Sequence, residues 1–413
     1  MKPTIGIFFG GKTTEHEVSI ITGLQAFAAI EREKYDCVPV YITKSNDFYA
    51  GESVGKIEEY SNIPALLKDT KKCKQVTLLN QGGKVGLYEV TPKKIDVRKP
   101  LAILDIALPC VHGTNAEDGT LQGFFEMLRL PYAGCDVLSS AIGMDKYVQK
   151  TVLKQAGIPV LDCVTFSAKR FVNEKESLLI EIAAKIGTPA IVKPINLGSS
   201  IGISIAANHD ELITSIENAL LFSERIIVES AIANLKEINV SVSGDKDEAE
   251  ASECEEPVAS NPGNSSGKIL DYNDKYSGGE KNGKNSSKSS GMASLKRKIP
   301  AEISPAVRDE IRNTAVKAFK ALGCSGVARI DFLIDNDSNK IYFNEINTIP
   351  GSLSFYLWEP LGISYSDLLE KTFTLALKRE RERANLNFSF ESNILSGFKG
   401  GFKNGKNPNG SKT

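Results

Sequence analysis

Two carboxylates and an amide near the C-terminus have the spacing of a divalent-cation site. Asp331 lies near the start of an apolar run, and Glu345 and Asn347 end the next run. Because side chains alternate along a strand, Arg329 shares a face with Asp331, and Glu345 with Asn347. If the two faces coincide across a hairpin, the oxygens suit one or two Mg²⁺ ions bridging a nucleotide's phosphates. The alternative is a pair of solvated strand faces, although burying an acid and an amide among Ile, Phe and Tyr is costly without a partner or a metal.

Candidate phosphate-binding groups lie in the middle of the chain. Lys193 ends an apolar strand, and the loop at 196–202 (NLGSSIG) follows it. Its backbone N–H groups and hydroxyls are donors for phosphate oxygens, although hairpins also use glycine turns. Lys146 is a second candidate, with a solvated helix lysine as the alternative. After the carboxylate set, Pro350-Gly351 permits a close turn whose N–H could face a developing oxyanion.

The glycines near the N-terminus imitate a phosphate loop. Gly6 to Thr13 formally matches G-x-x-x-x-G-K-[ST], but the first glycine lies inside the expected strand, where its N–H is not free for a phosphate. We predict instead a strand, a glycine turn and a helix capped by Thr14, with Glu17 completing a capping box. Glu15 then lies at the positive end of that helix, either as dipole compensation or to hold a ligand amine.

The elements that must position these residues alternate between strands and helices. Strands are expected at 4–9, 37–42, 101–111, 189–194, 201–206, 226–229, 238–242, 326–335 and 340–346, and helices at 17–30, 121–128, 144–156, 210–220 and 364–378. The opening strand, glycine loop, helix and strand indicate a doubly wound α/β domain. The turn-rich stretch at 335–339 indicates an antiparallel hairpin.

Three segments depart from this globular pattern. Residues 245–256 hold seven acids and one lysine, and residues 277–290 are almost wholly Ser, Gly, Asn and Lys. Such segments cannot bury enough apolar surface to fold alone, so we expect mobile surface loops. Residues 397–413 are rich in Gly, Asn and Lys and are expected to form a disordered tail.

Composition excludes several classes of protein. The 413 residues carry 50 Lys+Arg and 51 Asp+Glu, a net charge of −1, so a general DNA binder is not expected. No apolar run approaches the roughly 20 residues that cross a bilayer, and no signal-peptide cleavage site follows the first strand, so we expect a cytoplasmic protein. Seven cysteines without C-x-x-C and only three histidines argue against disulfide, zinc or histidine-rich sites, which leaves oxygen ligands and Mg²⁺ or Mn²⁺.

Seven motifs in order resemble the D-alanine–D-alanine ligases of the ATP-grasp superfamily. They are 9–19 (FGGKTTEHEVS), 112–123 (HGTNAEDGTLQG), 143–146 (GMDK), 192–194 (VKP) with 198–202 (GSSIG), 271–276 (DYNDKY), 329–331 (RID) and 344–351 (NEINTIPG). Any one motif is modest support, whereas seven in the same order between residue 1 and about residue 378 are specific.

The resemblance implies an α/β (α+β ATP-grasp) fold. It has an N-terminal doubly wound parallel-sheet domain at 1–134, ATP-grasp subdomains at 135–227 and 228–387, and a disordered basic tail at 388–413. A mobile lid at 271–292 would close over ATP and substrate. The implied reaction is ATP-dependent ligation of two D-alanines through an acyl phosphate, for peptidoglycan precursor synthesis. The implied partners are ATP, D-alanine and two Mg²⁺ or Mn²⁺ ions, in a homodimer that binds neither nucleic acid nor membrane.

The resemblance also implies residue roles. Glu15 would hold the first amino group, linked to Ser199 and Tyr276, and Arg329 with the Gly351 backbone would stabilise the tetrahedral intermediate. The implied substrate-binding residues are His112, Val18 and Tyr356. The implied phosphate-facing residues are Lys146, Lys193, Ser200 and Lys275. The implied adenine and ribose residues are Glu229, Ile232 and Glu237, and the implied magnesium ligands are Asp331, Glu345 and Asn347.

The chain departs from the family pattern in three places. The acidic segment and the Ser/Gly/Lys lid are unusual, the tail has no counterpart, and Tyr356 stands where the family has a serine that contacts the second substrate. Two alternatives therefore stay open: a ligase with D-serine, D-lactate or another acceptor, and a nucleotide- or nucleic-acid-binding protein that uses the basic tail. Tyr276 favours an amine acceptor, because the family's lactate-using members lack the Asp-Lys-Tyr motif.

Overall fold

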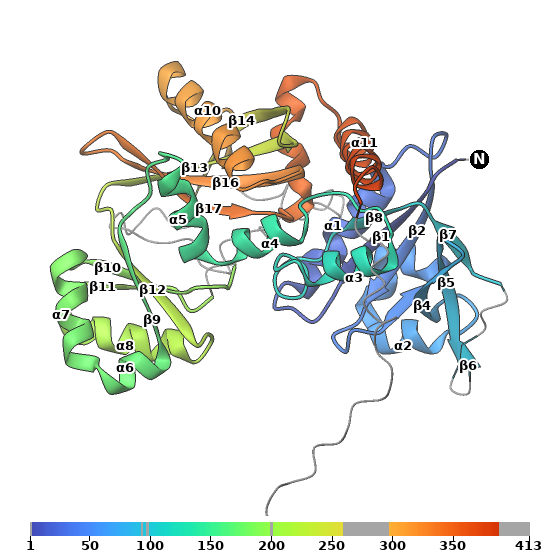
Figure 1. Ribbon diagram of the computed structural model, residues 1–413, viewed down its shortest axis with the longest axis horizontal. Helices are drawn as coiled ribbons and strands as arrows, with labels where there is room; N and C mark the ends of the chain where they lie inside the picture. Colours follow the sequence, from blue (N-terminus) through green and yellow to red (C-terminus); the bar gives the residue numbers. More distant parts are fainter. Residues whose placement is uncertain (1, 92–93, 96–98, 199–200, 259–296, 388–413) are drawn as a thin grey trace, which may run out of the picture.

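The computed structural model describes residues 2–91, 94–95, 99–198, 201–258 and 297–387. Several sequence predictions lie outside these residues: Ser199 and Ser200, the lid with Lys275 and Tyr276, the Ser/Gly/Lys stretch and the tail. Within the described residues the chain forms three sheets, each covered by helices (Figure 1). The α/β class expected from the sequence is confirmed.

The first sheet is mixed, with the strand order β6-β5-β4-β3-β2-β1-β8 and with β7 paired to β5. Its strands are β1 (Thr4–Gly10), β2 (Asp36–Ile42), β3 (Phe48–Ala50), β4 (Lys74–Gln81), β5 (Lys84–Thr91), β6 (Lys94–Ile95), β7 (Ala102–Leu104) and β8 (Ile106–Pro109), and its helices are α1 (His16–Ala29), η1 (Glu52–Gly55), η2 (Ile57–Asn62), α2 (Ile63–Lys68) and α3 (Thr120–Leu128). Only β2, β1 and β8 pair in parallel among the described strands. They lie at one end of the strand order, where β1 is between β2 and β8 and is buried along nearly its whole length, so it is continuously apolar.

The strand expected over 101–111 is interrupted at Asp105. Its carboxylate accepts a hydrogen bond from the Thr4 N–H at 2.8 Å, and the chain there leaves β7, which pairs with β5, for β8, which pairs with β1. An exposed side-chain-to-backbone hydrogen bond therefore marks the point where one strand ends and the next begins. The prediction of a single strand was wrong at this point.

The predicted capping box before α1 is also wrong. The N-cap of α1 is Glu15, without a side-chain cap hydrogen bond, and the Glu17 carboxylate instead pairs with Lys44 at 2.9 Å. Gly10 and Gly11 have φ of 96° and 92°, so the chain turns before the helix where a side chain would be strained. Gly6 lies inside β1, as expected when the phosphate-loop match was rejected.

A connecting pair of helices leads to the second sheet, whose order is β11-β10-β12-β9. The helix expected at 144–156 is two helices, because the Asp145 carboxylate caps a new helix at the N–H groups of Tyr147 and Val148. The elements are α4 (Val137–Met144), α5 (Lys146–Gln155), β9 (Cys163–Ser167), α6 (Ala168–Asn173), α7 (Lys175–Lys185), β10 (Ala190–Pro194), β11 (Ser204–Ala206), α8 (His209–Leu220) and β12 (Arg225–Ser230).

The third sheet has the order β15-β14-β13-β16-β17 and is antiparallel throughout its described pairs. Its elements are β13 (Leu235–Gly244), β14 (Ala249–Pro257), β15 (Arg297–Lys298), α10 (Pro305–Ala321), β16 (Gly326–Asp335), β17 (Lys340–Asn347), η4 (Gly351–Leu357), η5 (Glu359–Leu361) and α11 (Tyr365–Ala384). Helix α10 covers one face of this sheet (Figure 1). The hairpin expected between residues 326 and 346 is confirmed.

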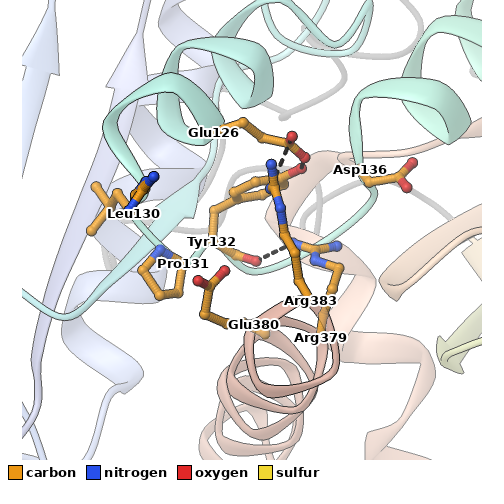
Figure 2. A pocket seen from close by; sticks show the side chains of 10 residues that line it. Glu126, Leu130, Pro131, Tyr132, Asp136, Arg379, Glu380 and Arg383 are labelled. Carbon is orange, nitrogen blue, oxygen red and sulfur yellow. Dashed lines mark hydrogen bonds and ion pairs between the residues drawn. The ribbon is translucent and has the colours of Figure 1, made fainter. Parts of the chain in front are cut away.

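Helix α11, near the C-terminal end of the chain, packs against the N-terminal part of the chain. Its buried residues Leu369, Phe373 and Ala376 belong to the apolar core around the first sheet. A cavity of about 320 Å³ lies where α11 meets the end of α3. Arg383 pairs with Glu126 at 2.9 Å, and Arg379 donates to the Tyr132 carbonyl; Figure 2 shows these side chains around the cavity. The C-terminal helix thus holds the first sheet's domain beside the third sheet.

The acidic segment at 245–256 is not a mobile loop, and that prediction was wrong. Most of it forms strand β14, between β13 and β15, with Glu253 and Glu255 buried. Arg308 on α10 binds both oxygens of Glu253, at 2.7 and 2.6 Å, and Arg297 on β15 donates to Glu255 at 2.8 Å. Basic residues from distant segments neutralise the acids, which composition alone does not show.

All seven cysteines lie in the described residues and are free thiols, five of them buried, as their spacing led us to expect. Among the described residues, none of the helices combines the length and the apolar character that crossing a bilayer requires.

We expect Arg308→Met to lower the free energy of unfolding by about 1–3 kcal/mol, because it leaves the buried Glu253 carboxylate unpaired. The loss is smaller than for a fully buried pair because the Arg308 side chain is 32% exposed. Urea denaturation would measure it. The double variant Arg308→Met/Glu253→Gln should recover part of the loss, and Lys56→Met, which breaks an exposed pair, is the control. Equal stability of the Arg308→Met variant and the wild type would show that the pair does not stabilise β14.

Candidate active site

One end of the site is built around a buried histidine. The His112 Nδ1 atom lies 2.7 Å from the Ile349 carbonyl, and its Nε2 atom lies 2.8 Å from the Thr22 hydroxyl. A carbonyl only accepts, so Nδ1 carries the proton and Nε2 accepts from Thr22, which in turn accepts from the Ser352 N–H at 3.0 Å. Burial lowers the pKa of His112, which is consistent with this neutral tautomer.

Glu15 lies where two glycine-containing loops meet. A methyl group placed on Gly113 would lie 3.2 Å from Glu15 Oε2, and one placed on Gly198 would lie 3.4 Å from the same atom. The carboxylate is buried and adjoins both the His112 loop and the loop that leads into residues 199–200. The structure therefore places Glu15 close to the loop that carries Ser199, whose own position lies outside the described residues.

Glu117 is a third ionisable group at this end, and the sequence analysis did not single it out. Its two oxygens accept hydrogen bonds from the Gly113 N–H at 3.0 Å and from the Ile349 N–H at 3.3 Å. Burial, with the charge of Glu15 as a smaller contribution, raises the pKa of Glu117 to about 8. Glu117 joins the His112 loop to the turn after β17, so the two loops have a fixed relative position.

The other end of the site lies between the second and third sheets. Lys193 on β10 reaches Glu229 Oε2 on β12 at 2.7 Å and Asn344 Oδ1 on β17 at 3.3 Å. All three come from different strands, and Glu229 has no exposed surface. Burial raises the pKa of Glu229, but the Lys150 and Lys193 ammonium groups outweigh it and lower that pKa to about 2. The carboxylate is therefore ionised and anchors both lysines.

Lys146, on α5, also reaches β17 of the third sheet. Its Nζ donates to the Leu197 carbonyl at 2.7 Å and lies 3.3 Å from Glu345 Oε2. The side chain is only 7% exposed, so the alternative of a solvated helix lysine is wrong. Two lysines of the second sheet and its flanking helix thus face β17, the strand that carries Asn344, Glu345 and Asn347.

The carboxylate–amide set lies on one face, which the sequence analysis had left open, because a shift of register between Asp331 and Phe332 aligns the two strand faces. Asp331 is directly opposite Glu345, and Arg329 is opposite Asn347. Arg329 binds both oxygens of Asp331, at 2.7 and 2.8 Å, and Asn347 Nδ2 donates to Asp331 Oδ2 at 3.3 Å. Among the described residues, no three His, Cys, Asp or Glu side chains lie close enough together to hold a metal ion by themselves. A metal site here would therefore also need the side-chain amide oxygen of Asn347.

The turn after β17 has an unusual backbone. Ser352, Leu353 and Ser354 follow Gly351 with φ of 54°, 48° and 52°, a left-handed conformation that non-glycine residues rarely adopt in succession. The buried Tyr356 follows, and the Arg297 guanidinium lies 4.0 Å from its ring centre. Burial raises the pKa of Tyr356 to about 12, so its hydroxyl is protonated at neutral pH.

The remaining predicted residues are less tightly connected. Val18 is buried on α1, Ile232 is half-buried in the loop after β12, and Glu237 on β13 is close enough to raise the pKa of Lys193. The sequence analysis did not single out Thr22, Glu117 or Lys150. Of these three residues, only Lys150 could have been found from the sequence, because it is four residues from Lys146 and therefore lies on the same face of the helix.

Comparisons with known proteins agree over most of the chain. A family model described as the D-ala D-ala ligase N-terminus matches residues 4–135, and one described as the D-ala D-ala ligase C-terminus matches residues 152–374. A D-alanine–D-alanine ligase of Thermosipho melanesiensis is 38% identical over 393 residues, 95% of this chain and 98% of that protein. One of Chloroherpeton thalassium is 37% identical over 92% of this chain and 98% of that protein.

Two solved structures have the same fold. The VanG D-Ala:D-Ser ligase of Enterococcus faecalis has a TM-score of 0.73 and 31% identity, over 91% of this chain and all of that one. The D-alanine–D-alanine ligase of Coxiella burnetii has a TM-score of 0.73 and 27% identity, over 93% of this chain and 96% of that one.

We expect the stability that Glu229 contributes to depend on pH in the acid range. Its pKa of about 2 lies below its usual 4.5, so the contribution is complete above pH 4.5 and is lost as the pH falls toward 2. The shift corresponds to roughly 3 kcal/mol. Wild type should therefore exceed Glu229→Gln in free energy of unfolding at pH 6, and the difference should shrink by pH 3.

Urea denaturation at both pH values would measure this difference. Glu52→Gln, at an exposed pair, is the control and should show no comparable change. A difference between wild type and Glu229→Gln that stays constant from pH 6 to pH 3 would contradict the assigned ion pairs.

Proposed function

Because the chain belongs to the D-alanine–D-alanine ligase family, we propose that it joins two D-alanines to D-alanyl-D-alanine for peptidoglycan precursor synthesis, converting ATP to ADP and phosphate. The supporting observation is the arrangement of β17, whose Asn344 contacts Lys193 and whose Glu345 contacts Lys146. A strand bearing oxygen ligands thus faces two lysines, the combination that phosphoryl transfer needs for positioning and charge neutralisation.

The reaction has two steps. The γ-phosphoryl group passes to the carboxylate of the first D-alanine, giving an acyl phosphate, and the amine of the second then attacks the carbonyl and phosphate leaves. Lys146 and Lys193 would neutralise the phosphate oxygens. Glu15, buried beside Gly113 and Gly198, would hold the first ammonium group. Ser199 and Tyr276 would link to it, and Ser200 and Lys275 would face the phosphates, as the family resemblance implies.

The tetrahedral intermediate would form beside Arg329. The Arg329 side chain is 11% exposed and holds Asp331 through two hydrogen bonds, so its orientation is fixed before substrate arrives. The Gly351 N–H, at the start of η4, would be a second donor to the oxyanion. His112 and Val18 would line the first-substrate site, and Glu229, Ile232 and Glu237 would form the adenine and ribose pocket.

The family uses a divalent metal with ATP. Asp331, Glu345 and Asn347 fit such a metal, because the strand register places their oxygen-bearing side chains on one face of the β16–β17 hairpin. We propose that they hold two Mg²⁺ or Mn²⁺ ions. When bound, the metal would neutralise charge on the nucleotide's phosphates.

D-Serine is the second candidate for the acceptor. The E. faecalis relative is a D-Ala:D-Ser ligase, and in this chain Tyr356 occupies the position where the family resemblance implies an acceptor-contacting serine. The positive charges of Arg329 and Arg297 both lie close enough to Tyr356 to favour its ionised form, against the effect of burial. The acceptor end of the site therefore differs in size and charge from one lined by serine.

A homodimer stays a prediction, which light scattering on the purified protein would check.

We expect phosphate release from ATP only when a D-amino acid is present. Supplying D-alanine alone should give the full rate and D-alanyl-D-alanine as product, because one molecule is donor and the other acceptor. D-Alanine with D-serine or D-lactate tests the alternative acceptors, and L-alanine is the control. If no pair of D-amino acids gives phosphate release, the ligase assignment is refuted.

We expect Glu345→Gln to lower kcat by about 100-fold or more without unfolding the chain, since the substitution removes a charge needed for metal and lysine contacts. Glu359→Gln, at an exposed position on η5, is the matched control and should keep full activity. Thermal denaturation would confirm that both variants fold. Near-normal turnover of the Glu345→Gln enzyme would rule out the metal assignment.

A further inference from the structure

Helix α5 carries a second buried lysine, one turn beyond Lys146. Lys150 is four residues further on, so both side chains project from one face of the helix. Lys150 is only 2% exposed, whereas Lys154, another turn along, has a 69% exposed side chain that pairs with Asp162. A fully desolvated ammonium is costly, so Lys150 must have a compensating partner.

That partner is Glu229. Lys150 Nζ lies 2.8 Å from Glu229 Oε1, while Lys193 Nζ lies 2.7 Å from Glu229 Oε2. One carboxylate is thus held between two ammonium groups, and each oxygen has its own lysine. Burial lowers the pKa of Lys150, and the neighbouring Lys193 lowers it further, while Glu229 opposes both. Two positive charges against one negative charge leave this cluster with a net positive charge.

The contact between Lys150 and Glu229 affects the position of Lys193. This lysine also contacts Asn344 at 3.3 Å, so it lies between the second sheet and β17. If Lys150 were absent, Glu229 Oε1 would be a buried carboxylate oxygen without a counter-charge. The carboxylate would then rotate to share both oxygens with Lys193, or protonate, and either change moves the Lys193 ammonium away from its position facing β17.

We propose that Lys150 is a positioning residue of the nucleotide site: it fixes the Glu229 carboxylate, and Glu229 fixes Lys193 toward the bound nucleotide. The inference rests on the proposed function, because it assumes that Lys193 faces a nucleotide. Lys150 itself touches neither phosphate nor amino acid in this scheme, and acts through Glu229.

Lys150→Met tests this, since methionine keeps the length of the side chain and removes its charge. Full-length wild type and variant would be titrated with Mg·ADP by calorimetry, and KM for ATP and for D-alanine would be measured. We expect Mg·ADP affinity to fall and KM for ATP to rise by about tenfold or more, with KM for D-alanine changed by less than about twofold. Lys150→Arg should restore part of the affinity, and Lys154→Met should match wild type.

Unchanged Mg·ADP affinity in Lys150→Met would overturn the proposal, as would equal losses for ATP and D-alanine, which indicate a structural role. If Lys150→Met fails to fold, Lys150→Arg decides: intermediate affinity supports the proposal, and wild-type affinity overturns it. Failure of the proposed function is seen separately. Wild type that binds Mg·ADP but ligates no D-amino acids refutes the ligase assignment, while the ADP comparison still decides the role of Lys150.

Discussion

Charge compensation among buried ionisable groups is the interaction on which the site depends. Lys146, Lys150 and Lys193 are nearly inaccessible to water, and so are Glu229 and Asp331. No such group is stable alone, so each lies within ion-pair distance of a counter-charge. The partners of the three lysines lie on other elements, whereas Asp331 pairs with Arg329 on its own strand. The same contacts that make burial tolerable also determine where the ammonium groups point, so the electrostatics and the geometry of the site have one origin.

Polar contacts within the site also connect parts of the chain that fold around separate hydrophobic cores. Lys193 belongs to a strand of the second sheet and contacts β17 of the third. At the other end, the first sheet's His112 loop is joined to the turn after β17 through His112, Glu117 and Thr22. Each of these contacts uses a backbone group of that turn. The left-handed residues 352–354 are tolerated because the surrounding contacts hold the turn in place.

Strand β14 shows how composition can mislead. Seven acids in twelve residues lack the apolar pattern of a strand, and in isolation they would repel one another. In the folded chain Glu253 meets Arg308, Glu255 meets Arg297, and Glu256 lies 3.4 Å from Lys236. The arginines and the lysine come from α10, β15 and β13, so the segment becomes a strand only once distant partners supply positive charge.

Local patterns were enough to locate the strands and helices that carry most of the site, such as β1, β10, β16, β17 and α1, because periods of two and 3.6 residues record which face of an element is buried. They missed β3 to β6, β9, α6, α7 and α10. They also showed that Arg329 shares a face with Asp331, and Glu345 with Asn347. Whether the two faces coincide was decided only in the folded chain, because the register set at the turn would place Asp331 opposite Asn344, and a shift of register between Asp331 and Phe332 places it opposite Glu345. The family resemblance rests on the same kind of local motif. The break at Asp105, the cap at Asp145, the pairing of β14 and the burial of Lys150 were decided only in three dimensions. Each depends on a partner far along the chain or on a local competition between caps, and a buried charge is stable only where such a partner exists.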